Sequence, residues 1–179
     1  ATGRFVCWIK IMEKDGTQDY TILSAAQLLG PYKLEKEHFR PFGFSGGDFD
    51  LAQENGEACI FFEKVHSEMI CARLTPDHLD VEEGVRFLER PHPPFVREAP
   101  AHFARENTHY LITSGTTGYF PNPSLLCTAK QLFAAYTEAG DPHSGDLSHT
   151  SFHSQISSVF RIPGQNVWIA LADRWLPDC

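Results

Sequence analysis

The sequence predicts an all-β protein, a partial β-propeller with about three blades and the start of a fourth, in a single domain over residues 1–179. Three observations support this prediction. Short apolar strands return roughly every fifty residues, a second motif repeats in phase with them, and each repeat carries one group of polar residues. Repeats of this length that contain several strands are typical of propeller blades.

The apolar strands are the clearest part of the repeat. Their starts are 53, 51 and 58 residues apart. The segments are FVCWIKI at 5–11, ACIFFE at 58–63, HYLITS at 109–114 and VWIALA at 167–172. Each of the last three follows a polar turn (ENG, REN or PGQN), as expected for a hairpin that leads into a buried strand.

A second motif repeats at the same period. The segments SAAQLLGPYKL (24–34) and CTAKQLFAAYTEA (127–139) share Ala, Gln-Leu and Tyr in register. Tyr32 and Tyr136 are 104 residues apart, which is two periods of 52. ICARLT (70–75) fills the corresponding place in the middle repeat. None of these segments has the i, i+3, i+4 pattern of a helix, and Gly, Pro and Asn turns separate them.

Composition narrows the class of protein. The net charge of -8 argues against nucleic acid as a partner, because nucleic-acid binders concentrate Lys and Arg on one face. No apolar run reaches the roughly 18 residues of a membrane span, and no signal-peptide pattern is visible. The five cysteines form no C-x-x-C pair and mostly lie in apolar runs, so we expect buried thiols.

The ends of the sequence suggest part of a longer protein. A strand is predicted four residues after the start, and another ends shortly before the last residue. The cellular compartment and the oligomeric state therefore stay open. An incomplete ring of blades would also leave two open sheet edges, which tend to pair with other chains.

Polar residues occur just before or within the strands expected to border the central channel, where propellers bind ligands. The groups are Asp48 and Asp50 in SGGDFDLA (45–52), Glu98 in REAPAHF (97–103), and His153 and Gln155 in TSFHSQISSVF (150–160). Asp48 and Glu98 are 50 residues apart, and Glu98 and Gln155 are 57 apart. They thus hold nearly equivalent places in successive blades and would converge on one channel.

Two converging carboxyl groups are what glycoside hydrolysis requires, since one must remain protonated to supply the leaving group with a proton. Simpler roles stay open for each residue. Asp48 or Asp50 could cap a glycine-rich turn. Glu98 could pair with the adjacent Arg97, and Gln155 could bond to backbone.

Other chemistries have less support. The histidines of the third repeat lack an acidic or cysteine partner at a metal-site spacing, so no metal is predicted. SGTTGYF (114–120) is rich in glycine but lacks the Lys-Ser/Thr of a phosphate loop. No G-x-S-x-G elbow accompanies the Ser, His and Asp residues.

SGGDFDLAQENGEACIFFE, REAPAHFARENTHYLITSGTTGYFPNPS and TSFHSQISSVF…VWIALADRW together resemble the five-bladed β-propeller enzymes of glycoside hydrolase family 43. The likeness is to members grouped with exo-β-1,3-galactanases and related galactosidases. It covers essentially the whole chain, as blades two and three and much of blade four. Most of blade one and the last blade would then lie outside the sequence.

The resemblance implies roles for the three equivalent residues. Glu98 matches the general acid of an inverting mechanism, and Asp48 matches the aspartate that tunes and orients it. Gln155 matches a glutamine that holds the attacking water in the galactanase-like branch, where the usual blade-one aspartate base is missing. The family's arginine-aspartate pair is here GGD, so Asp50 could be the true match instead of Asp48.

The resemblance also suggests Thr116, Tyr20 and Glu89 as substrate-binding residues, and His153 and Asp50 are expected to join them from the polar groups at the channel. It implies no required cofactor. Some family members hold a calcium ion in the channel, but this sequence does not specify ligands for one. The expected activity is exo-acting hydrolysis of galactose-containing or related plant polysaccharides. The alternatives are α-L-arabinofuranosidase or β-xylosidase specificity, and a sugar-binding propeller without turnover.

Overall fold

The computed structural model describes residues 3–176, which form β-strands and one 3-10 turn, Pro41–Gly43. The strands fall into four antiparallel sheets. The first sheet contains β1 (Phe5–Met12), β2 (Gln18–Ala25) and β3 (Lys33–Phe39). The second contains β4 (Gly46–Glu54), β5 (Glu57–Lys64), β6 (Glu68–Leu74) and β7 (Val81–Phe87). None of the described residues belongs to a helix with the length and apolar character needed to cross a membrane.

The third and fourth sheets continue the same pattern. The third contains β8 (Arg97–Arg105), β9 (Thr108–Gly115), β10 (Leu125–Ala129) and β11 (Thr137–Gly140). The fourth contains β12 (Ser154–Arg161) and β13 (Trp168–Arg174). Within each sheet, strands that follow one another in the chain lie side by side.

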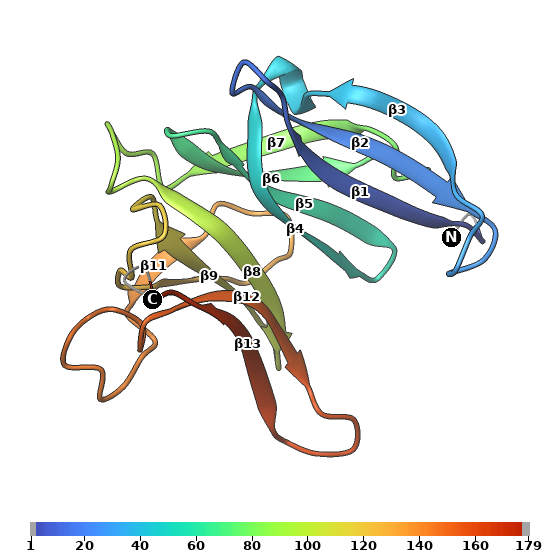
Figure 1. The fold of residues 1–179 in the computed structure, drawn as a ribbon. Coiled ribbons are helices and arrows are strands. Elements are labelled where there is room, and N and C mark those ends of the chain that lie inside the picture. The colour runs from blue at the N-terminus through green and yellow to red at the C-terminus, as the bar shows by residue number, and fades with distance from the viewer. Residues whose placement is uncertain (1–2, 177–179) are drawn as a thin grey trace.

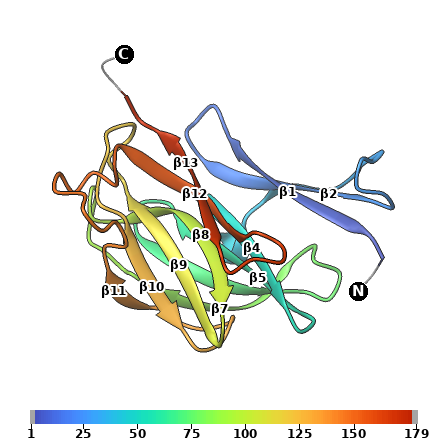
Figure 2. The same ribbon diagram turned by 90° about the horizontal axis from the view of Figure 1, so that it is seen from below.

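The sheets are arranged around the strands that begin them. β8 contacts both β4 and β12, and it lies between them in Figures 1 and 2. The remaining strands of each sheet lead outward from this centre (Figure 1). This arrangement confirms the predicted partial β-propeller, with two four-stranded blades between a three-stranded and a two-stranded sheet.

The repeat in the sequence corresponds to a repeat in space. The predicted apolar segments are β1, β5, β9 and β13, and the last three are each the second strand of their sheet. The Gln-Leu…Tyr motif also makes the same side-chain hydrogen bond twice. The Tyr32 hydroxyl donates to the Leu28 carbonyl (2.9 Å), and the Tyr136 hydroxyl donates to the Leu132 carbonyl (3.2 Å). Both turns lead into the outermost strand of their sheet.

The core lies between the sheets, and β5 is at its centre because both of its faces are covered. Phe61 faces the third sheet, in a cluster with Leu111 and Tyr136. Phe62 faces the first sheet, in a cluster with Tyr20 and Ile22. Each such phenylalanine contributes about 1.5–3 kcal/mol when it leaves water. A smaller cluster around Ala101, Ile112 and Ile156 joins the third and fourth sheets.

The cysteines confirm the expectation of thiols as far as the structure describes them. Cys59, Cys71 and Cys127 are free and buried, and Cys7 is free and partly buried. The Cys71 thiol lies 3.6 Å from the Leu132 carbonyl, within reach of a weak hydrogen bond. The fifth, Cys179, lies outside the described residues.

Candidate active site

The starts of β4, β8 and β12 bring together the three residues that the sequence placed in equivalent positions. Asp48 lies near the start of β4, Glu98 near the start of β8 and Gln155 near the start of β12. The Gln155 amide nitrogen is 3.5 Å from Glu98 Oε1, a long hydrogen bond. Asp48 is near enough for its negative charge to raise the pKa of Glu98. Sequence spacing and spatial convergence therefore agree.

Each of these strands carries a β-bulge at the site. The pairing register shifts between Gly46 and Phe49 in β4, between Glu98 and Ala101 in β8, and between Ile156 and Ser158 in β12. In β8 the bulge includes Ala99, whose backbone has a φ of 48°. Bulges redirect side chains and are common beside active sites, because they break the strict alternation of a strand.

Glu98 has the properties of a carboxyl group that stays protonated near neutral pH. Its pKa is raised from 4.5 to about 7, first by burial and then by the nearby negative charges of Glu63 and Asp48. The positive charge of Lys10 and the Gln155 hydrogen bond act in the opposite direction, more weakly. A carboxylic acid with a pKa near the working pH is suited to general acid catalysis.

Arg97 is not the partner of Glu98. Its guanidinium donates instead to the carbonyls of Thr113 (2.6 Å) and Pro123 (3.1 Å) and to the Thr113 hydroxyl. Successive side chains of a strand point to opposite faces, so the two neighbours face different surroundings. The ion pair that the sequence left open does not form, and Glu98 keeps no local counter-ion on its own strand.

Asp48 and Asp50 have different surroundings, although the sequence could not separate them. Asp48 Oδ1 forms an ion pair with the Lys10 ammonium, contributed by β1. Asp50 Oδ2 accepts a hydrogen bond from the His102 backbone N–H (2.7 Å). That bond joins β4 to β8, and burial raises the pKa of Asp50. Asp48 therefore faces the site, whereas Asp50 connects two blades.

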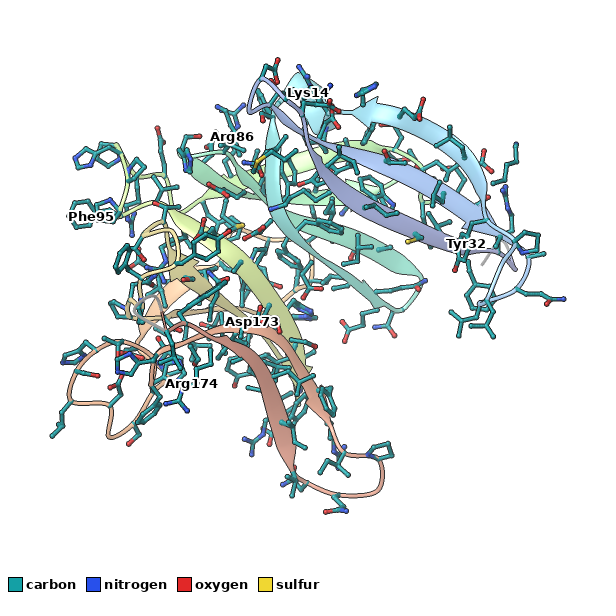
Figure 3. All side chains as sticks on the ribbon, in the orientation of Figure 1. Lys14, Tyr32, Arg86, Phe95, Asp173 and Arg174 are labelled. Atoms are coloured by element: carbon teal, nitrogen blue, oxygen red, sulfur yellow. The ribbon has the colours of Figure 1, made fainter. Side chains whose placement is uncertain are left out.

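A cavity of about 260 Å³ opens beside Asp48 and Gln155, and Ala99, the neighbour of Glu98, forms part of its wall. Its lining includes Lys10, Asp48, Gln155 and Asp173. Asp173 is the cross-strand partner of Gln155 in the β12–β13 hairpin, and Figure 3 labels it near the centre of the view. Hollows of about 360 and 460 Å³ lie elsewhere, but no carboxyl group lines either of them. Of these three, the 260 Å³ cavity is therefore the one lined by carboxyl groups.

Three residues of this region were not found from the sequence: Lys10, Glu63 and Asp173. Lys10 interrupts the apolar strand FVCWIKI, which was its only signal. Glu63 ends the apolar run ACIFFE and is only 3% exposed. Asp173 depends on the register of the β12–β13 hairpin, which no local pattern reveals.

Glu63 lies in β5, opposite the bulge of β4 that contains Gly47 and Asp48. Its Oε1 accepts a hydrogen bond from the His66 backbone N–H (2.8 Å), and burial raises its pKa. A Cβ atom on Gly47 would lie 2.3 Å from Glu63 Oε2. A Cβ atom on Gly46 would lie 2.6 Å from the ring and hydroxyl of Tyr20. Any side chain in place of either glycine of SGGD would therefore force Glu63 or Tyr20 to move.

The other predicted residues take different positions. Tyr20 is fully buried and its hydroxyl donates to the Gly47 carbonyl (2.8 Å), so it supports the site from below. Thr116 lies two residues past Ser114, the strand partner of Glu98, and its hydroxyl is buried with no hydrogen-bond partner among residues 3–176. Glu89 and His153 are exposed, in the segments before β8 and β12, and do not line the cavity.

Comparison with known proteins finds similar structures but no similar sequences. No family model matches the sequence. No curated protein matches it either. Among solved structures, 98% of the chain superposes on a family 43 β-1,3-galactosidase with galactodeoxynojirimycin (TM-score 0.84, 22% identity). It superposes over the same share on a second family 43 β-1,3-galactosidase (0.81, 23%).

A third similar structure is an exo-β-1,3-galactanase from Phanerochaete chrysosporium with β-1,3-galactotriose, at a TM-score of 0.78 and 20% identity over 98% of the chain. The chain spans 65% of the length of the first galactosidase, 38% of the second and 40% of the galactanase. At these identities the likeness establishes the fold that they share with this chain.

Proposed function

We propose that this chain is part of a family 43-type glycoside hydrolase that releases sugars from the ends of galactose-containing polysaccharides such as β-1,3-galactan. The observation that carries the proposal is Glu98. A carboxyl group with a pKa of about 7 contacts a glutamine amide and is influenced by the charge of a second carboxylate, where the first strands of three blades meet. A lone structural carboxyl group would not need this arrangement.

In the proposed reaction Glu98 acts as the general acid. It transfers its proton to the glycosidic oxygen as the bond from that oxygen to the anomeric carbon breaks. Water attacks the anomeric carbon from the opposite face and adds its oxygen there, so the configuration inverts. The leaving sugar keeps the proton from Glu98, and the water gives up one of its own.

The neighbouring residues have supporting roles. Asp48 keeps the pKa of Glu98 raised by its negative charge, and Lys10 holds Asp48 in place through their ion pair. Gln155 positions the attacking water through its side-chain amide. Asp173, beside Gln155 at the cavity, is the described carboxylate best placed to take the water's proton.

The proposed substrate rests on two supports. The sequence resembles the galactanase-like branch, and the superposed structures include one with a galactose-configured inhibitor and one with β-1,3-galactotriose. Arabinofuranosidase or xylosidase specificity would use the same acid, and a sugar-binding protein without turnover would need none. These alternatives therefore become outcomes of the experiment.

The test uses the full-length protein that contains this chain. Wild type, E98Q and E106Q are assayed on an aryl β-galactoside, an aryl α-L-arabinofuranoside, an aryl β-xyloside and β-1,3-galactan. Glu106 is the matched control because its side chain is 83% exposed in the turn between β8 and β9. We expect release of galactose by wild type and E106Q, and a loss of about 100-fold or more in E98Q.

A second measurement separates an acid from a merely structural residue. A 2,4-dinitrophenyl glycoside has a leaving group that departs without protonation, so E98Q should retain most of its activity on that substrate. Equal loss on both substrates would remove Glu98 as the acid. Sugar binding with no hydrolysis of any substrate would favour a non-catalytic sugar-binding protein, and release of arabinose or xylose alone would correct the specificity.

A further inference from the structure

A cluster of three potential metal ligands lies on the first sheet, apart from the cavity. Glu13 is in the turn between β1 and β2, Asp19 is in β2 and His38 is in β3. Each offers one ligand atom, and these atoms all lie within 4.8 Å of one another. His38 Nδ1 is 3.1 Å from Glu13 Oε1 and 3.3 Å from Asp19 Oδ2. Ligand atoms that share one metal ion are separated by distances of this size.

The burial of Asp19 also points to a bound cation. Its side chain is only 1% exposed, although carboxylates are rarely buried without a partner. Its Oδ1 is buried and has no hydrogen-bond partner in the part of the chain that the structure describes. Because a buried carboxylate oxygen without a partner is costly, Oδ1 favours a cation that would bind to it.

The backbone presents His38 to the two carboxylates. The β2–β3 pairing passes from Tyr20↔Phe39 to Ile22↔Lys36, so the register shifts at this point. His38 has a φ of 51°, in the left-handed region that residues other than glycine seldom occupy, and its side chain is thereby redirected. The imidazole side chain is 67% exposed, which leaves a path for an ion to enter. The bulge thus brings an accessible nitrogen ligand over a buried oxygen ligand.

We propose that Glu13, Asp19 and His38 bind a divalent transition-metal cation of the Zn²⁺ type. An imidazole nitrogen with two carboxylate oxygens suits Zn²⁺, whereas Ca²⁺ and Mg²⁺ prefer oxygen ligands alone. A cation held by both oxygens of Asp19 would also satisfy Oδ1. The ion would fasten the β1–β2 turn to the end of β3, on the sheet that supplies Lys10 to the cavity.

A proton is the competing occupant. Protonated His38 would form ion pairs with both carboxylates, and Arg40 Nη2 lies 3.8 Å from Asp19 Oδ2. The Arg40 side chain is 44% exposed, so it can turn into solvent when a cation binds. The ion-pair arrangement leaves Asp19 Oδ1 without a partner, whereas a bound cation would satisfy both oxygens of Asp19.

The test measures binding and uses no enzymatic activity, so its outcome is independent of the proposed function. The purified protein is stripped with a chelator and titrated with ZnCl₂ by calorimetry, beside CaCl₂ and MgCl₂. The variants are E13Q and H38N, with H78N as the control. His78 also has a positive φ (61°) and lies in a different loop, so H78N matches the chemical change made in H38N.

We expect one equivalent of Zn²⁺ to bind to wild type and H78N and to raise the melting temperature of both. E13Q and H38N should bind Zn²⁺ more weakly by more than about tenfold, which is the loss that even an outer-shell change causes. Substitution with Co²⁺ should give the visible spectrum of nitrogen and oxygen ligands without sulfur charge-transfer bands. No saturable binding, equal binding by E13Q and H38N, or sulfur bands from the free cysteines would each overturn the proposal.

Discussion

Replacing Glu98 with glutamine should change how the stability of the protein depends on pH. The folded protein raises the pKa of Glu98 from 4.5 to about 7, so the folded state holds this proton more tightly than the unfolded state. The protonated form contributes its full stability below about pH 4.5, and that contribution is lost as the pH rises through about 7. Glutamine is neutral throughout and loses nothing.

The size of the effect follows from the same values. The rise in pKa corresponds to about 3 kcal/mol between the two protonation states. Glu98 is only partly buried and lies beside an open cavity, so solvent screening reduces the effect. We therefore expect the free energy of unfolding of E98Q, relative to wild type, to increase by about 1–3 kcal/mol between pH 4.5 and pH 8.

Urea denaturation followed by tryptophan fluorescence measures this difference at several pH values. Subtracting the wild-type curve cancels the titration of all other groups, and E106Q serves as the control with a flat difference. A difference that did not change with pH, or that fell as the pH rose, would refute the assignment of a raised pKa to Glu98. The measurement holds whether or not the protein is an enzyme.

Further predictions concern the charges around Glu98 and the buried thiols. If Glu98 is the acid, kcat/KM for an aryl galactoside should fall above about pH 7, and E63Q should move this limb to lower pH because it removes a nearby negative charge. K10M should move the limb to higher pH, and shifts of the same sign in both variants would contradict the electrostatic reasoning. Burial raises the pKa of the Cys127 thiol to about 12, and a hydrogen bond with Cys59, followed by burial, raises the pKa of Cys71. Neither thiol should therefore react with a thiol reagent until the protein unfolds, and fast labelling of the folded protein would show that these sites open.

The repeat was visible in the sequence because each blade reuses one physical pattern. In the last three sheets the second strand carries the apolar run, and a polar turn precedes it, as in the run ACIFFE. Equal spacing then placed Asp48, Glu98 and Gln155 on equivalent strands, and the structure brings them together. Patterns of this kind are local, so sequence reasoning can reach them.

What the sequence did not show depends on contacts between distant segments. Asp48 and Asp50 are two residues apart and would share one face of a regular strand. They have different surroundings because the bulge in β4 interrupts the regular pattern at Asp48. Asp173 enters the site through the register of its hairpin, and Lys10 enters through the packing of the first sheet against the second. Tyr20 is a residue type that often lines sugar-binding sites. Its hydroxyl, however, donates a hydrogen bond to the Gly47 carbonyl.

The crowded glycines at the start of β4 make this part of the molecule a case of epistasis. A side chain at position 47 would collide with Glu63, and one at position 46 would collide with Tyr20. The effect of a substitution at position 47 therefore depends on residue 63, and the effect of one at position 46 depends on residue 20. Related sequences should therefore change Gly47 together with Glu63, and Gly46 together with Tyr20, as covarying pairs. A library that varied the glycines alone should recover fewer folded members than one that varied each glycine together with its neighbour, Glu63 or Tyr20.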